Sequence, residues 1–271
     1  MSKAAQIPDA LDPDRIKSHL KTSRIGKKVV VYNSTASTND IAGEYAKNKG
    51  NDGLVVLAEE QTQGRGRSGN RWVSRRGDSI LCSILLTESS LGAELLPLTM
   101  AVAVAEAIGK CAKSDAQIKW PNDIILNCKK VAGILVESRR HGRHIYYVIG
   151  IGINCHQRKG DFPAELQKTA TSIDIETDRF TDRISLIRRL LTSVDHWIET
   201  AEAGREQVIE RWRRLSTQLG HRVSVIYNKK KFSGNCIGID PDKGLVLQLD
   251  TGSTRFFHAS HTTVVKESAD K

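Results

Sequence analysis

A segment rich in glycine and arginine, residues 61–72 (QTQGRGRSGNRW), lies between two apolar runs that we predict to be buried strands, 54–58 and 80–86. Its glycines match the G-x-G-x-x-G spacing of a dinucleotide-binding fingerprint, but that fingerprint needs a helix that begins at the last glycine. Residues 70–78 have no helical apolar face, and no G-K-[ST] follows as in a phosphate-binding P-loop. The sequence therefore excludes both a dinucleotide-binding motif and a P-loop in this segment.

This segment instead predicts a ligand-binding loop, because glycine lets the backbone approach a ligand and arginine makes forked contacts with phosphate oxygens. The alternative is a disordered segment of the RG type that contacts nucleic acid. The position between two buried strands favours the ligand loop.

The remaining pattern predicts an α+β protein with a change of architecture near residue 217. Before it we expect a helix from about Thr38, a core helix over 95–111, two helices between 184 and 215, and strands at 118–120, 124–126, 131–137 and 146–153. After it come short strands at 223–227, 232–239, 245–249 and 254–258, a size and spacing typical of a small β-barrel. The predicted domains are 1–217 and 218–271.

Composition narrows the class of protein but not the ligand. A net charge of +10 attracts polyanions such as ATP, acidic protein surfaces or nucleic acid, without selecting among them. The most apolar stretch, 95–108, is interrupted by Pro97 and Glu106, and no secretory signal opens the chain, so we expect no membrane segment. Five cysteines without a C-x-x-C pair argue for reduced thiols, against a zinc site and for a cytoplasmic protein.

Three further segments carry groups suited to a nucleotide or a carboxylate. In residues 119–123 (KWPND), Asn122 and Asp123 offer oxygens to a ribose or a hydrated magnesium ion, or simply form a polar turn. Lys130 precedes an apolar strand and can hold a carboxylate or phosphate, although such a lysine is usually a surface residue. Alternate glycines in 150–154 (GIGIN) clear one strand face for a flat ligand or for a packed helix.

Taken in order, these segments resemble the biotin protein ligase family. The matching elements are Ser37-Thr38-Asn39, Gln61 with residues 64–69, Trp72, residues 119–123, 130–137 and 150–154. The resemblance implies a mixed sheet with flanking helices, similar to class II aminoacyl-tRNA synthetases, followed by a small SH3-like β-barrel. It also implies that biotin and ATP form biotinyl-5′-AMP and that biotin passes to a lysine of a biotin carboxyl carrier protein. ATP and Mg²⁺ are then required, and no tightly bound prosthetic group is expected.

The resemblance also implies roles for individual residues. The catalytic residues would be Lys130, Arg67 and Arg65. Biotin would be bound by Ser37, Thr38, Asn39, Gln61, Gly64, Arg65, Gly133, Gly150 and Gly152. ATP would be bound by Arg67, Trp72, Asn122, Asp123, Lys130 and Asn154, with Asp123 also facing the magnesium ion.

The chain departs from the family pattern at two places. Ser68 and Asn70 replace arginines that many relatives carry in the loop, which bears on the affinity for the adenylate. About thirty residues precede the first motif, fewer than a winged helix-turn-helix needs, so we expect no repressor function and no DNA binding.

Two other functions stay open. A lipoate ligase shares the chemistry, although the loop followed by Trp72 and the 119–123 motif favours biotin. A nucleic-acid-binding protein would use the basic charge and the barrel aromatics Tyr227, Phe232, Phe256 and Phe257. The sequence does not distinguish a monomer from a homodimer.

Overall fold

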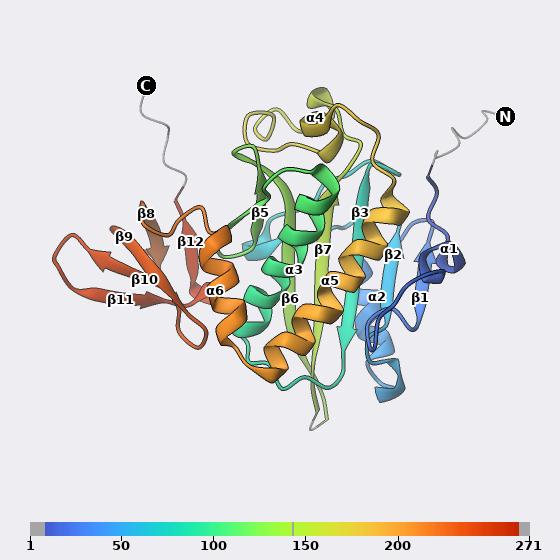
Figure 1. The fold of residues 1–271 in the computed structure, drawn as a ribbon, viewed down its shortest axis with the longest axis horizontal. Helices are drawn as coiled ribbons and strands as arrows, with labels where there is room; N and C mark the ends of the chain where they lie inside the picture. The colour runs from blue at the N-terminus through green and yellow to red at the C-terminus, as the bar shows by residue number, and fades with distance from the viewer. Residues whose placement is uncertain (1–8, 143, 266–271) are drawn as a thin grey trace.

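A seven-stranded mixed sheet forms the centre of the protein (Figure 1), whose computed structural model describes residues 9–142 and 144–265. Its strand order is β1-β2-β3-β7-β6-β5-β4, and β1 pairs with β2 in parallel whereas the other pairs are antiparallel. The strands are β1 (Val29–Tyr32), β2 (Val55–Ala58), β3 (Ser79–Leu86), β4 (Gln117–Lys119), β5 (Asp123–Leu126), β6 (Lys129–His141) and β7 (His144–Asn154). The mixed sheet with flanking helices was predicted.

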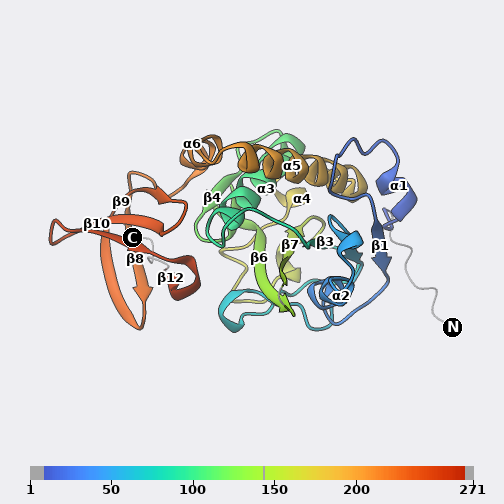
Figure 2. The ribbon, with the colours of Figure 1, turned by 90° about the horizontal axis from the view of Figure 1, so that it is seen from below.

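Helices cover both faces of this sheet. Figure 2 shows α3 and α5 on one face and α2 on the other. The helices are α1 (Pro13–Lys17), α2 (Thr38–Tyr45), α3 (Leu95–Ala112), α4 (Ile173–Thr177), α5 (Arg183–Ala203) and α6 (Glu206–Leu215). By length and composition α3 could cross a membrane, but 72% of it is buried within the protein. It packs against α5 and α6 as a core helix.

Alternation along the central strands separates the apolar core from a polar face. In β7, Ile149, Ile151 and Ile153 join the main hydrophobic core. Gly150 and Gly152, between them, point to the opposite face, toward α2. The same alternation in β3 sends Cys82 and Ile84 into the core and Ser83 toward α2. The candidate site therefore lies on the face of the sheet that α3 and α5 leave uncovered.

The C-terminal part is a five-stranded antiparallel sheet of order β11-β10-β9-β8-β12. Its strands are β8 (Arg222–Tyr227), β9 (Lys230–Asp240), β10 (Gly244–Leu249), β11 (Thr254–Phe257) and β12 (Thr262–Val264), of which β12 was not predicted. The change of architecture falls between α6 and β8, next to the proposed boundary at residue 217. A hydrogen bond crosses this boundary from the Trp120 N–H to Gln218 Oε1 (2.6 Å). Just before the boundary, the Thr217 N–H donates to the Ile118 carbonyl (2.9 Å).

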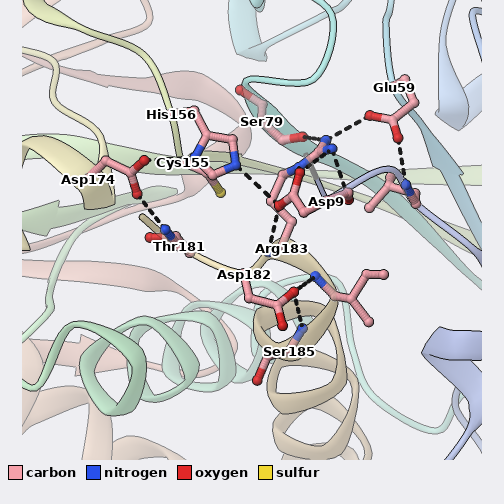
Figure 3. A network of polar contacts seen from close by, with 12 residues as sticks. Asp9, Glu59, Ser79, Cys155, His156, Asp174, Thr181, Asp182, Arg183 and Ser185 are labelled. Atoms are coloured by element: carbon pink, nitrogen blue, oxygen red, sulfur yellow. Dashed lines mark hydrogen bonds and ion pairs between the residues drawn. The ribbon is translucent and has the colours of Figure 1, made fainter. Parts of the chain in front are cut away.

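A buried charge cluster ties the start of the described chain to α5 (Figure 3). Arg183 is fully buried and donates to Asp9 Oδ1 (2.9 Å) and Glu59 Oε2 (2.8 Å), which supply the partners that a buried guanidinium requires. His156 lies between Asp9 (3.2 Å) and Asp174 (2.8 Å). Burial lowers the pKa of His156, but these hydrogen bonds outweigh burial and raise it to about 9.

Candidate functional site

One cavity brings together most of the predicted site residues. It is bounded by the first turn of α2, the loop 61–72, the β4–β5 turn, strands β6 and β7, and β12 of the C-terminal sheet. The predicted residues that line it are Ser37, Thr38, Asn39, Gln61, Arg65, Arg67, Trp72, Asn122, Asp123, Lys130, Gly133, Gly150 and Gly152. Ser68 and Asn70, where the chain departs from the family pattern, also line it.

Hydroxyl and amide groups gather at the start of α2. Ser37 is the N-cap residue of this helix, but its hydroxyl makes no capping hydrogen bond. Gln61 Oε1 accepts hydrogen bonds from the backbone N–H of Thr38 (2.7 Å) and from its hydroxyl (2.9 Å). Ser37, Thr38 and Asn39 are each less than 5% exposed. This end of the cavity is therefore a compact polar surface suited to a small neutral ring with N–H and C=O groups.

Glycines in β6 and β7 make room for two side chains of the protein itself. Gly133 and Gly152 are register partners, and a Cβ atom on Gly152 would lie 2.6 Å from Cε2 of Trp72. A Cβ atom on Gly150 would lie 2.6 Å from Oδ1 of Asn39. The Trp72 indole and the Asn39 amide therefore contact this face of the strands, and all three glycines also line the cavity.

Arg65 and Arg67, two of the three arginines in the loop 61–72, differ in their partners. Arg65 makes a two-pronged ion pair with Asp40 (2.6 and 2.7 Å), and Glu137 lies 3.7 Å from the same guanidinium. Arg67 forms no ion pair with a carboxylate of the described residues; it donates to Asn122 Oδ1 (3.3 Å) and to the Ala259 carbonyl. The positive charge of Arg65 is thus already balanced, whereas that of Arg67 is available to an anion.

Burial affects the charge of Arg67. Removal from water lowers the pKa of its guanidinium, an effect that the nearby carboxylates of Asp123 and Glu94 partly offset. The ordinary pKa of arginine lies so far above neutrality that the side chain stays charged at neutral pH after such a change. A desolvated cation attracts a phosphate more strongly than one in water does.

Lys130 and Asp123 form the other charged wall of the cavity. The Lys130 ammonium lies 2.5 Å from Asp123 Oδ1 and 5.9 Å from the centre of the Trp72 ring. Asn122 is fixed by donating to the Ile134 carbonyl (3.1 Å), which leaves its Oδ1 facing Arg67. Within residues 9–142 and 144–265, no three His, Cys, Asp or Glu side chains are grouped as a metal site. The oxygens of Asp123 and Asn122 suit a magnesium ion held mainly by nucleotide phosphates.

Two predicted residues do not line this cavity. Gly64 lies behind it, where its carbonyl accepts from the Trp72 N–H (3.0 Å) and where a Cβ atom would meet the Trp72 carbonyl at 2.6 Å. Asn154 is buried at the end of β7, donates to the Thr171 carbonyl (2.9 Å) and accepts from Gln157 (3.2 Å). The structure therefore gives Gly64 a role in closing the loop and buries Asn154 outside the cavity. A contact between Asn154 and the nucleotide stays a prediction.

Other residues around the cavity were not anticipated. Thr262, Thr263 and Val264 of β12 form part of the wall. The carboxylates of Asp40 and Glu137 hold Arg65. They also pair with a second arginine, Arg139, which lies 3.2 Å from Asp40 and 2.9 Å from Glu137. The position of Glu137 at the end of a motif strand was the one signal in the sequence that pointed to this group.

Comparison with known proteins identifies the family. Residues 31–154 match the model of the Biotin/lipoate A/B protein ligase family. The Bifunctional ligase/repressor BirA of Bacillus subtilis is 32% identical over 256 residues, which cover 93% of this chain and 79% of that protein. This chain belongs to the biotin/lipoate A/B protein ligase family.

Two further members of this ligase family extend the likeness. The Biotin--[acetyl-CoA-carboxylase] ligase of Mycobacterium tuberculosis is 29% identical over 229 residues, covering 80% of this chain and 83% of that protein. The structure of the biotin protein ligase from Aquifex aeolicus in complex with biotin and ATP is 25% identical, with a TM-score of 0.75 over 89% of this chain and 100% of that one. Every predicted site residue, from Ser37 to Asn154, lies in the span matched by the ligase family, whereas β12 lies outside it.

Proposed function

We propose that this chain uses ATP to convert biotin to biotinyl-5′-AMP and then transfers biotin to a lysine of a biotin carboxyl carrier protein. One observation carries the proposal: a single cavity joins a hydroxyl and amide cluster to a cationic wall. The first can hold a cyclic urea, and the second can hold a carboxylate beside a triphosphate. A chain that activates biotin needs the polar cluster and the cationic wall in the same cavity, because the two substrates must react with each other there.

In the first step, a carboxylate oxygen of biotin attacks the α-phosphorus of ATP and pyrophosphate leaves. Lys130 is placed to hold the carboxylate and the α-phosphate together, while Asp123 fixes its ammonium group. Arg67 counters the negative charge that develops during transfer. Magnesium would arrive with ATP, shield the phosphates and face Asp123 and Asn122.

We assign Arg65 to loop positioning rather than to the phosphate. Its guanidinium is shared between Asp40 and Glu137, and these hydrogen bonds raise the pKa of Arg65 despite partial burial. Releasing it to a phosphate would leave two carboxylates without their partner. Of these two arginines, Arg67 is then the one that contacts the reacting groups.

In the second step, the amine of the acceptor lysine attacks the carbonyl carbon of the mixed anhydride, and AMP leaves. The loop would shield the adenylate from water until the acceptor arrives. The buried indole N–H of Trp72 has no hydrogen-bond partner among the described residues, so it is available to a polar group of the adenylate.

The cellular setting is part of the proposal. We expect a cytoplasmic enzyme, in keeping with five cysteines that form no disulfide. We also expect no DNA binding at physiological salt, which an electrophoretic shift assay with duplex DNA tests. Sedimentation with and without biotin and ATP tests whether the chain forms a homodimer.

Pyrophosphate release from ATP and Mg²⁺, with biotin or lipoate added in turn and no carrier present, tests the activity. Biotin-dependent release with retained biotinyl-AMP is the expected result. Release with lipoate alone would replace biotin by lipoate as the substrate. No release with either would refute the adenylation reaction.

A further inference from the structure

Lys130 lies at a β-bulge near the start of β6. Ile124 of β5 pairs with Ala132 of β6. The next residue of β5, Ile125, pairs with Lys130, so Val131 has no partner on β5. Regular alternation would turn Lys130 to the same face as Ala132, which belongs to the hydrophobic core. The extra residue in the bulge instead turns Lys130 toward the cavity, where its side chain forms part of the wall.

The backbone of Lys130 is held by a segment that precedes α4. The Lys130 N–H donates to the Thr169 carbonyl (2.8 Å), and the Lys130 carbonyl accepts from the Thr171 N–H (2.9 Å). These two hydrogen bonds form an isolated parallel bridge between Lys130 and Ala170. Because both backbone polar groups of the lysine contact residues 169–171, its position depends on where this segment lies.

Glu176 of the short helix α4 joins this segment to the turn before Lys130. Its Oε1 accepts from the Thr171 hydroxyl (2.5 Å), and its Oε2 accepts from Asn127 Nδ2 (2.7 Å). Asn127 and Cys128 form the turn between β5 and β6 and have φ angles of 47° and 65°, as the two central residues of a tight hairpin require. One carboxylate therefore fixes both the turn that leads into the bulge and the segment that pairs with it.

The residues next to Glu176 are themselves fixed to the end of β7. Ser172, the N-cap residue of α4, is fully buried and donates from its hydroxyl to the Gln157 carbonyl (2.7 Å). Thr171 is 1% exposed, and its carbonyl accepts from Asn154 Nδ2 (2.9 Å). The Glu176 carboxylate is thus presented from a backbone that two buried hydrogen bonds hold against the central sheet.

We propose that Glu176 is a positioning residue for the first step, because by holding the turn 127–128 and Thr171 it keeps the Lys130 ammonium group where the biotin carboxylate meets the α-phosphate. The inference rests on the proposed role of Lys130 in biotin activation. Glu176 does not line the cavity, so it acts through the lysine and not on a substrate. It also lies outside residues 31–154, which match the ligase family. Losing this carboxylate would displace the ammonium group without removing it, and a displacement of about 1 Å is enough to slow a reaction severely.

The test compares Glu176→Ala with Asp195→Asn, its matched control. The Asp195 carboxylate on α5 also accepts from uncharged donors, the backbone N–H groups of Ser23, Arg24 and Ile25 (2.6, 2.9 and 2.8 Å), and none of these residues lines the cavity. Pyrophosphate release in the first turnover is measured with biotin, ATP and Mg²⁺. It gives the maximum rate and the half-saturating concentration of each substrate. Unfolding in urea records the stability of each variant.

Glu176→Ala should lower the maximum rate about tenfold and leave both half-saturating concentrations within about twofold of the wild type. Asp195→Asn should lose stability in urea without slowing the turnover. In a Lys130→Ala background, Glu176→Ala should slow the reaction no further, because the ammonium group that it positions is gone. Glu176→Gln should keep most of the rate, since its amide oxygen can accept from Asn127 while its amide N–H donates to the Thr171 hydroxyl.

Failure of this inference can be told apart from failure of the proposed function. If the wild type is active and Glu176→Ala turns over as fast as Asp195→Asn, the role of Glu176 is overturned while biotin activation stands. A tenfold slowing that persists in the Lys130→Ala background would also overturn it, because the effect would then not act through the lysine. A wild-type protein that releases no pyrophosphate with biotin would overturn this inference together with the proposed function.

Discussion

Replacing Gly152 by alanine tests whether the Trp72 indole truly depends on the bare face of β7. The new methyl group would lie 2.6 Å from Cε2 of Trp72, where ordinary contacts begin at 3.4 Å. The indole must therefore move away from the strand by about 0.8 Å, and overpacking of this kind costs about 1–3 kcal/mol. Because Trp72 lines the cavity, we also expect KM for ATP to rise by roughly tenfold.

A double-mutant cycle assigns this cost to the contact. Unfolding in urea, followed by circular dichroism, is measured for Gly152→Ala, Trp72→Ala and the double variant. Without the indole, the alanine at 152 should cost nothing, which gives a coupling energy of about 2 kcal/mol. Gly133→Ala is the control, because its new methyl group would lie 3.2 Å from Cζ3 of Trp72 and so press less closely on the indole. An undiminished cost of Gly152→Ala in the Trp72→Ala background would refute the reasoning.

Three further predictions concern charge. Lys130→Ala should slow pyrophosphate release by roughly 100-fold. Arg67→Gly should instead let biotinyl-AMP escape from the protein, which is measured as biotinyl-AMP that passes an ultrafiltration membrane. Equal losses of adenylate formation and adenylate retention in both variants would contradict this division of roles. Asp40→Asn should cost only about 0.5 kcal/mol, since its ion pair with Arg65 is partly exposed, yet trypsin should cut the loop 61–72 faster than in the wild type. The raised pKa of His156, about 9 against 6.5 when unfolded, means that the folded state binds the extra proton. Stability should be full below pH 6.5 and fall by about 3 kcal/mol as pH rises through 9, a loss that His156→Gln should abolish in urea titrations.

Local sequence pattern predicted the elements that carry the site. Strands β2 and β3 on either side of the loop, the core helix α3 and the hairpin-rich C-terminal part all follow from periodicity and turn residues. The motif residues then met in one cavity because β6 and β7 pair in register at Gly133 and Gly152. Short elements without a periodic pattern, such as α1 and β12, were not predicted.

Contacts between segments that are distant along the chain could not be predicted from the sequence. Arg183 finds Asp9 across 174 positions, and Arg65 finds Asp40 on a helix that precedes the loop. Asn154 is separated from Gly150 and Gly152 by an even number of positions along β7, so strand alternation predicted that it lies on the same face as the glycines. Residues after β7 turn back over the strand end, and Thr171 takes the amide. Ser83 did give a signal, a polar residue inside an apolar strand, but its partners appear only in the fold.

The Ala259 carbonyl that holds Arg67 belongs to the main chain, so every amino acid at position 259 would supply it equally well. The side chain at position 259 can therefore change in evolution while the path of the backbone stays constrained. A sequence alignment, which records side chains, would understate what the C-terminal part contributes to the cavity wall at Arg67. Ligases that differ widely after residue 217 would still share this acceptor wherever the sheet docks in the same place.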